Sequence, residues 1–388
     1  MGVMAKGSAE NGGGQIFETD KAQAKEELDM GRCMLWARES CNKGLTSQVA
    51  EMFSLSRGEG KLTPQEYYYF GLCDDGRYTA EEKKRFIGLK ATNKIYAKHI
   101  SPYYHGIAHD KLLAYGVLEG FQIPVPRTLA VYHRFRSYGG VPVFSNREVL
   151  AAHLRQGMTY PFFSKPIGGF ASLGIAAVES YDAGSDRLLL GDGREIPLAD
   201  YVAELDGFES GALFQEKLLS HPQIAEATGG RVSTIRLILL VRDEGPEVYR
   251  AIWKVMAGGN MADNFWRNGN LLGAVEPETG RVYRVIRGVG PEQEEIEAHP
   301  DSGAAVKDIV LPDWDRLLEL GHTTAAIFPE LRIIALDIAL CPQGPVVVEV
   351  NIGGALNLPQ LATGKGILEP KFVDFLEEVG PPRYIYGC

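Results

Sequence analysis

The chain has 388 residues, of which 45% are hydrophobic and 23% charged, as expected for a globular protein in solution. Its 40 basic and 50 acidic residues give a net charge of −10, which argues against a general nucleic-acid or anionic-membrane surface. Five cysteines without a C-x-x-C pair indicate neither a disulfide framework nor a zinc site, and no apolar run has the length of a secretory signal or a membrane span, so we expect a cytoplasmic protein.

The first part of the chain is mainly helical. Residues 1–20 are polar and rich in glycine, and we expect them to form a disordered tail. Residues 21–105 have helical periodicity, and Thr79 and Glu82 form a capping-box pattern at the start of one helix. A further amphipathic helix ends at Gly120 and is followed by an extended segment.

Strands dominate the remainder. A block from about 127 to 217 reads as short strands, with a hairpin turn at 192–194. Two long strands around Arg236 and Lys254 come next, followed by a loop rich in glycine and asparagine. A helix at 313–328 then leads into a final hairpin. This order predicts an α+β fold in which most strands are antiparallel.

The final hairpin carries the most informative residues. Asp337 lies on its first strand, and Glu349 and Asn351 lie on its second. Because side chains alternate along a strand, we expect Val347 to share a face with Glu349 and Asn351. Facing carboxylates repel unless a cation lies between them, and an all-oxygen set of ligands suits Mg²⁺. A solvated sheet face with two ordinary acids is the alternative interpretation.

The turn of this hairpin predicts its register. A three-residue loop at 342–344, with glycine at the position that requires positive φ, would place Cys341 opposite Pro345. Counting back along both strands then puts Asp337 opposite Glu349. The asparagine two residues further along would lie diagonally across from the aspartate.

A second candidate site begins at Lys165, which ends a strand and opens a loop containing Gly168, Gly169 and Ser172. Glycines allow backbone N–H groups to approach phosphate oxygens, and a lysine at the base of the loop supplies positive charge. The loop lacks the G-x-x-x-x-G-K-[ST] pattern, so it is not a Walker A loop. A glycine hairpin beside a surface lysine is the alternative.

A third candidate is the segment of Gln215, Glu216, Lys217 and Leu218, which follows an apolar strand end. The backbone of such a segment can pair with the edge of an adenine base, while Glu216 accepts a hydrogen bond from the amino group of that base. A charge pair on an edge strand fits the same pattern equally well.

Arg236 and Lys254 each interrupt an apolar strand. Long cations in such places usually extend from a solvated face. If both strands back the acidic hairpin, these cations would instead point at phosphates or at a substrate carboxylate. The sequence leaves both interpretations open.

Taken in order, these motifs resemble those of the ATP-grasp superfamily over about residues 106–365. They are a helix that opens on Lys111, the K-P-x-G-G loop, an E-K-L hinge, a strand with an arginine, and the D…E-x-N set. The run ADNFWRNGNLLGAVEPETGRV, which contains the D-N dipeptide Asp263–Asn264, resembles the sugar-transfer-associated ATP-grasp group more narrowly. The pattern departs from D-alanine ligases at Ala335, where those enzymes carry arginine.

The resemblance implies an ATP-grasp fold, in which two α+β subdomains hold ATP between them. It divides the chain into the tail, the helical region at 21–105 and an ATP-grasp core at 106–388. Within the core, residues from about 127 to 214 would form the lid, and residues 215–388 would form the metal-binding subdomain. The helical region stands where such enzymes usually have an α/β domain.

The resemblance also implies three groups of site residues. The metal ligands, for two Mg²⁺ ions or for Mn²⁺ in their place, would be Asp337, Glu349 and Asn351. The catalytic cations would be Arg236 and Lys254. The ATP ligands would be Lys111, Lys165, Gly168, Gly169, Ser172, Gln215, Glu216, Lys217 and Leu218.

In ATP-grasp enzymes of this kind, a substrate carboxylate attacks the γ-phosphorus of ATP to give an acyl phosphate and ADP, and an amine or another nucleophile then displaces phosphate. The implied function is an ADP-forming carboxylate–amine ligase that acts on a small molecule or a glycan precursor. An ATP-grasp kinase that phosphorylates a hydroxyl, and an ATP-binding regulator without turnover, are the alternatives. The expected partners are small-molecule substrates, with no nucleic acid and no membrane insertion.

Overall fold

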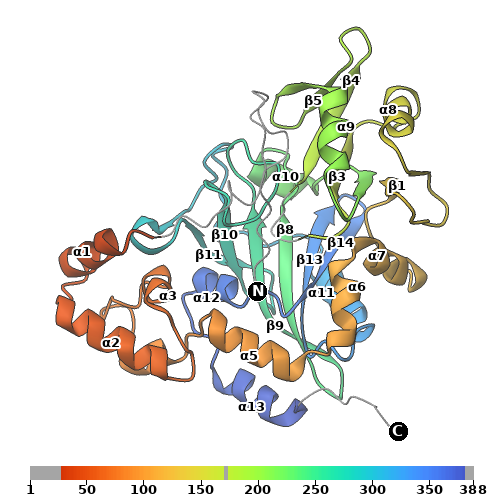
Figure 1. Cartoon of the computed structure of the whole chain (residues 1–388). Helices are drawn as coiled ribbons and strands as arrows, with labels where there is room; N and C mark the ends of the chain where they lie inside the picture. The colour runs from red at the N-terminus through yellow and green to blue at the C-terminus, as the bar shows by residue number, and fades with distance from the viewer. Residues whose placement is uncertain (1–27, 170–173, 381–388) are drawn as a thin grey trace.

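The structure is a computed structural model that describes residues 28–169 and 174–380. It contains two seven-stranded sheets and an amino-terminal group of helices (Figure 1). The predicted mixture of helices and sheets, with a helical region first, is confirmed. The predicted tail, the start of the first predicted helix and Ser172 lie outside the described residues. Within those residues, no helix is both long and apolar enough to cross a bilayer.

The amino-terminal helices pack on the second sheet, away from the first sheet (Figure 1). The predicted capping box of Thr79 and Glu82 is confirmed at the start of α4, and Thr63 and Glu66 form a second one at α3. Apolar side chains of the helices form a common cluster with residues of the sheet. The helices are α1 (Met30–Ser40), α2 (Leu45–Arg57), α3 (Pro64–Tyr69), α4 (Ala80–Lys84) and α5 (Leu89–His99).

The first sheet has the strand order β2-β1-β7-β3-β4-β5-β6. The expected hairpin around 192–194 is present and joins β5 to β6. Helices α8 (Arg147–Gln156) and α9 (Leu198–Asp206) contribute to the core of this sheet. Its strands are β1 (Thr128–Tyr132), β2 (Val143–Phe144), β3 (Phe162–Pro166), β4 (Ala176–Asp182), β5 (Arg187–Leu190), β6 (Glu195–Pro197) and β7 (Ala212–Glu216).

The second sheet has the order β12-β11-β10-β9-β8-β13-β14. The two long strands expected around Arg236 and Lys254 are confirmed as the antiparallel neighbours β8 and β9. Their apolar runs are explained by helices on both faces. The strands are β8 (Thr234–Val241), β9 (Pro246–Val255), β10 (Leu271–Val275), β11 (Val282–Arg287), β12 (Glu294–Glu295), β13 (Ile333–Cys341) and β14 (Gly344–Ile352).

Two helices cover opposite faces of the second sheet. On one face, a side chain at Gly321 of α11 (Trp314–Ala326) would lie 2.7 Å from Leu237, so this helix packs closely on β8. On the other face, Leu358 and Leu361 of α12 (Asn357–Thr363) join the cluster that contains Ile252. The remaining helices are α6 (His105–His109), α7 (Lys111–Gly120), α10 (Pro222–Thr228), α13 (Pro370–Val379) and the 3₁₀ turns Pro102–Tyr104 and Gly290–Glu292.

One cross-strand row on the α12 face positions the polar residues. Asp337 pairs with Arg236, which pairs with Ile252. Ile252 pairs with Ala274, and Ala274 pairs with Arg284. Residues that face each other across antiparallel strands point to the same side of a sheet. The row therefore has charged side chains at both ends and an apolar middle that the helices cover.

Candidate active site

The hairpin of β13 and β14 places Asp337 directly opposite Glu349, as predicted. The predicted turn is wrong, because Cys341 pairs with Gly344 and not with Pro345. The loop between the strands therefore has two residues and not three. On its own, this difference would have moved the acidic pair out of register by one residue.

A β-bulge in β14 restores the register. Ile338 pairs with Val347 while the next pair along is Asp337 with Glu349, so Val348 is an extra residue in its strand. The bulge also changes which side chains share a face. Val347 is fully buried in the core, whereas Val348 and Glu349 line a cavity. The prediction that Val347 shares a face with Glu349 is therefore wrong.

Asp337 is held by two cations from neighbouring strands. Arg236 donates from Nε to Oδ1 at 2.6 Å and from Nη2 to Oδ2 at 2.8 Å, and Lys254 Nζ donates to Oδ2 at 2.9 Å. Lys254 also contacts Asp263 at 3.2 Å, and Asp263 accepts hydrogen bonds from the backbone N–H and the hydroxyl of Thr234. Arg236 and Lys254 are only 8% and 6% exposed, so neither extends from a solvated face.

These contacts determine the charge state of the cluster. Burial opposes ionisation of Asp337, but the attraction of Arg236 and Lys254 outweighs it and lowers the pKa of this carboxyl. Burial also opposes the charge on Lys254, but Asp263 and Asp337 outweigh it and raise the pKa of that ammonium group. The two acids of the hairpin were expected to repel unless a metal lay between them. Instead, cations of the protein itself neutralise Asp337.

Lys111 links the glycine loop to the acidic hairpin. It is the first residue of α7, whose N-cap Asp110 forms a β-bridge with Gly168. The ammonium group of Lys111 donates to the carbonyl of Gly169 at 3.2 Å and lies 3.7 Å from Glu349 Oε1. Burial, with a smaller contribution from nearby Lys165, lowers the pKa of this lysine, although Glu349 opposes the change.

Lys165 is a buried cation on β3. Its Nζ donates to the hydroxyl of Tyr115 at 2.8 Å, and that hydroxyl donates to the carbonyl of Val348 at 2.5 Å. Burial lowers the pKa of Lys165 to about 8, in spite of the attraction of Glu349 and Asp337. The alternative of a surface lysine beside a glycine hairpin is therefore wrong. An anion bound beside this lysine would relieve part of its desolvation.

The segment that runs from the end of β7 into the following loop lines the cavity and forms several side-chain contacts. Gln215 donates from Nε2 to the carbonyl of Pro126 at 3.1 Å, and Lys217 Nζ pairs with Glu179 at 2.5 Å. Glu216 accepts a hydrogen bond from the backbone N–H of Arg127 at 2.9 Å, so one of its oxygens already has a donor.

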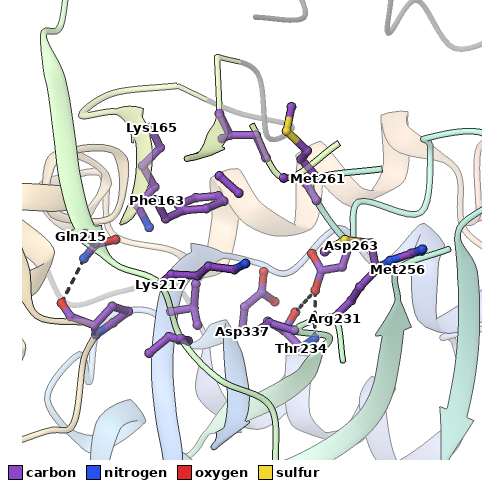
Figure 2. Close-up of a pocket in the computed structure, with 18 of the residues that line it drawn as sticks. Phe163, Lys165, Gln215, Lys217, Arg231, Thr234, Met256, Met261, Asp263 and Asp337 are labelled. Carbon is purple, nitrogen blue, oxygen red and sulfur yellow. Dashed lines mark hydrogen bonds between the residues drawn. The ribbon is translucent and has the colours of Figure 1, made fainter. Parts of the chain in front are cut away.

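Most of the candidate residues meet at one cavity of about 470 Å³ between the two sheets. Figure 2 shows Lys165, Gln215 and Lys217 on one side and Asp337, Thr234 and Asp263 on the other. Gly168, Arg236 and Asn351 do not line the cavity. The predicted residues that do line it are Lys111, Lys165, Gly169, Gln215, Glu216, Lys217, Leu218, Lys254, Asp337 and Glu349.

Several lining residues were not predicted from the sequence. Arg231 follows two glycines at the end of α10, and its guanidinium pairs with Asp301 at 2.7 Å. Met256, Asn260 and Met261 belong to the loop after β9. That loop is rich in glycine and asparagine, but it has no periodicity from which the orientation of a side chain could be predicted.

The two carboxylates of the hairpin, Asp337 and Glu349, supply only part of a set of ligands for a magnesium ion. Within the described chain, no group of three or more His, Cys, Asp and Glu residues is placed to hold a metal. Asn351 Nδ2 lies 3.5 Å from Glu349 Oε2, and a half-turn of the amide would direct its oxygen to the same place. Asp337 Oδ1 accepts one bond, from Arg236, and so keeps a lone pair. Two carboxylates and one amide oxygen are therefore ligands of the kind that Mg²⁺ prefers, with Asn351 placed beside Glu349 and outside the cavity lining.

Packing explains why an arginine is missing at Ala335. A Cβ atom on Gly354, which has φ +79°, would lie 2.6 Å from the Cβ of Ala335. The adjacent Gly353 lies against Tyr96 of α5, whose hydroxyl donates to the Gly353 carbonyl at 2.5 Å. The turn after β14 therefore occupies the space that a longer side chain at 335 would need. Arg236, from the neighbouring strand, supplies a guanidinium next to Asp337 instead.

Gly354→Ala should destabilise the protein by about 2–4 kcal/mol, because the new methyl group overlaps Ala335 and the backbone is in a left-handed conformation. Urea denaturation measures this change. Gly139→Ala is the matched control, because a methyl group there meets no atom within 4 Å and should change stability by less than about 1 kcal/mol. Equal stability of the two variants would contradict the close packing of this turn.

Comparison with known protein families assigns the chain to one of them. A sequence model described as sugar-transfer associated ATP-grasp matches residues 92–374. The chain belongs to this ATP-grasp family. The resemblance seen in the sequence is thereby confirmed, and the ATP-grasp fold with it. A search among curated proteins found no match.

Solved structures similar to this ATP-grasp chain are distant in sequence. The VanG D-Ala:D-Ser ligase from Enterococcus faecalis is 15% identical, with a TM-score of 0.40, over 72% of this chain and 63% of that one. The D-alanine–D-alanine ligase from Bacillus anthracis is 14% identical, with a TM-score of 0.38, over 74% of each chain. The N5-carboxyaminoimidazole ribonucleotide synthetase from Thermotoga maritima is 13% identical, with a TM-score of 0.34, over 69% and 49%.

Proposed function

We propose that this protein is an ATP-dependent, ADP-forming ligase that joins a carboxylate to an amine through an acyl phosphate. The observation that carries the proposal is the convergence of Lys111, Lys165 and Lys254 with Asp337 and Glu349 at one cavity between two sheets. A polyphosphate needs several cations in a dry site, and phosphoryl transfer needs them close to the transferring group. Membership of an ATP-grasp family supports ATP as the polyphosphate.

The two sheets would have different roles. We assign the first sheet to the lid over the nucleotide, with Lys165 and the Gly168–Gly169 loop on the phosphates. Gln215 to Leu218 would follow the adenine edge, where the free lone pairs of Glu216 can accept from the amino group. The second sheet would hold the reacting end of the nucleotide beside Lys254.

Phosphoryl transfer would take place at the second sheet. A substrate carboxylate oxygen bonds to the γ-phosphorus while the bond from that phosphorus to the β-phosphate oxygen breaks, and ADP leaves. An amine then attacks the acyl carbon, and phosphate leaves. Bound Mg²⁺, held by Glu349, Asn351 and Asp337, would neutralise charge on the β- and γ-phosphates. Arg236 does not line the cavity, so we assign it to positioning Asp337.

The test is ADP release from Mg²⁺-ATP in the presence of pools of carboxylates and amines. The proposed ligase releases ADP only when both a carboxylate and an amine are present, and the product contains a new amide bond detectable by mass spectrometry. ADP formation with a hydroxyl compound alone would identify a kinase. ATP binding without ADP in any mixture would identify a regulator.

The affinity for ATP should decrease at alkaline pH. Burial lowers the pKa of Lys165 to about 8 without ligand, and neighbouring phosphates would favour its protonated form. Below pH 8 the ammonium is already present, so affinity should change little. Above pH 8 a proton must be taken up on binding, and affinity should fall by up to about tenfold per pH unit. Calorimetry at pH 7 and pH 9 in buffers of different ionisation enthalpy measures both effects, and equal affinity without proton uptake would contradict the role of Lys165.

A further inference from the structure

A second cavity, of about 410 Å³, lies where the amino-terminal helices meet the second sheet. Its walls come from the segment around α4, from β11 and β12, and from the loop that follows α12. It shares no lining residue with the cavity between the two sheets. The proposed ligase reaction does not use it.

The carboxylates that line this second cavity already have donors. Glu82 accepts the capping hydrogen bonds at the start of α4. Glu295 accepts from Arg284 Nε at 2.7 Å, and Glu369 pairs with Arg250. Glu295 and Glu369 are therefore each paired with an arginine, whereas the donors to Glu82 belong to Thr79 and carry no charge.

Three lining cations form no direct ion pair within the described part of the chain, although the charge of Arg85 acts on Glu82 and that of Arg77 acts on Glu295. Arg77 donates to the neutral amide oxygen of Gln293 at 3.2 Å and stacks on the ring of Tyr78. The side chains of Arg85 and Lys365 form no hydrogen bond or ion pair with any described residue. The hydroxyl of Tyr78, a side chain only 6% exposed, also has no partner there. The cavity therefore has an excess of positive charge and free donors.

The walls of the cavity are fixed in place by close backbone contacts. A Cβ atom on Gly364, where φ is +67°, would lie 2.8 Å from Arg77 Nη2. A Cβ atom on Gly366 would lie 2.3 Å from the carbonyl carbon of Arg85. The buried Arg284 donates to two carbonyls at the end of α12, at 2.8 and 2.6 Å. The backbone around the cavity is therefore closely packed before a ligand arrives, whereas the side chains of Arg77, Arg85 and Lys365 are exposed.

We propose that this cavity binds a small phosphorylated compound that carries hydroxyl groups, such as a sugar phosphate. Arg77, Arg85 and Lys365 would hold the phosphate dianion, since guanidinium and ammonium groups form charge-assisted hydrogen bonds with it. Glu295 and Glu82 keep lone pairs that can accept from hydroxyl groups. The volume is within the range of small-molecule sites.

The first test is calorimetry on the full chain with glucose 6-phosphate, inorganic phosphate and glucose as probes. We expect glucose 6-phosphate to bind more tightly than phosphate and glucose not to bind. Equal affinity for phosphate and glucose 6-phosphate would overturn the hydroxyl part of the proposal and leave a site for free phosphate. The whole proposal would be overturned if neither glucose 6-phosphate nor inorganic phosphate binds at roughly 10 mM, because a dissociation constant above this concentration is too weak to be useful.

Variants then locate the binding. Arg85→Ala and Lys365→Ala should each weaken glucose 6-phosphate binding about fivefold to tenfold, because each removes a charge-assisted contact from an otherwise unchanged wall. Arg57→Ala, which removes an exposed cation of α2 outside the cavity, should leave the affinity unchanged. Lys165→Met should also leave it unchanged, because Lys165 lies in the first cavity. Binding that is lost in Lys165→Met but kept in both cavity variants would overturn the assignment, whatever the outcome for the ligase reaction.

Discussion

Glu349→Gln should lower ADP formation by about a thousandfold or more while leaving the fold intact. The substitution removes a negative charge without changing volume, at a position where the carboxylate lies 3.7 Å from Lys111 and beside Asn351. Loss of one preorganised charged group at a centre of phosphoryl transfer has an effect of about this size. Steady-state ADP release with the substrate pair identified in the screen measures it.

Two controls separate loss of chemistry from loss of structure. Glu319→Gln makes the same change on an exposed position of α11 and should leave turnover unchanged. Thermal unfolding of Glu349→Gln should match that of the parent within a few degrees, because this carboxylate is not fully buried and its ion-pair distance is long. Turnover equal to the parent's in Glu349→Gln would refute the assignment of a metal ligand.

Lys165→Met should make the protein more stable and weaken its binding of ATP. Burial lowers the pKa of Lys165 from 10.5 to about 8, which corresponds to a penalty of about 3 kcal/mol for keeping the charged form in the folded state. Methionine fills similar space without charge. The hydroxyl of Tyr115 keeps its bond to the Val348 carbonyl, so no new buried donor is left without an acceptor.

The sign of the stability change with pH follows from the two pKa values. Below pH 8 the lysine is charged in both the folded and unfolded states, and the folded state bears the full penalty. Between about pH 8 and 10.5 the folded state releases its proton first, so the parent gains stability as pH rises. The advantage of Lys165→Met should therefore be about 1–3 kcal/mol at pH 7 and should shrink at pH 10.

ATP affinity should change in the opposite direction. Loss of a buried cation that contacts phosphate should weaken binding by about 10- to 100-fold. Lys94→Met, at an exposed position of α5, is the matched control and should alter neither stability nor affinity appreciably. A variant at 165 that is both less stable than the parent and equal to it in ATP affinity would refute the proposed phosphate site.

The order of the motifs was predictable from the sequence, but the details of the hairpin were not. Asp337 faces Glu349 only because a two-residue turn and a bulge at Val348 compensate for each other. Because three valines precede Glu349, a shift of the strand register by one residue leaves the pattern of side chains unchanged and cannot be predicted from the sequence. The predicted pairing of Asp337 with Glu349 was therefore correct, although the predicted turn was wrong and the bulge was not predicted.

Long-range contacts account for most of what was missed. The bidentate pair of Arg236 with Asp337 joins residues 101 positions apart, and periodicity within either strand says nothing about which strands become neighbours. Similarly, Arg85 and Lys365 come together through packing of the helical region on the sheet. Lys111 and Lys165 could be selected because each stands at the boundary of an element, next to a recognisable motif.

Arg236 and Lys254 act as permanent counter-ions for Asp337, so the hairpin balances most of its charge before any ion is bound. Proteins that depend on a metal for this balance unfold in chelating buffers. EDTA should therefore leave the melting temperature of this protein unchanged, because the folded hairpin needs no bound ion to balance the charge of Asp337.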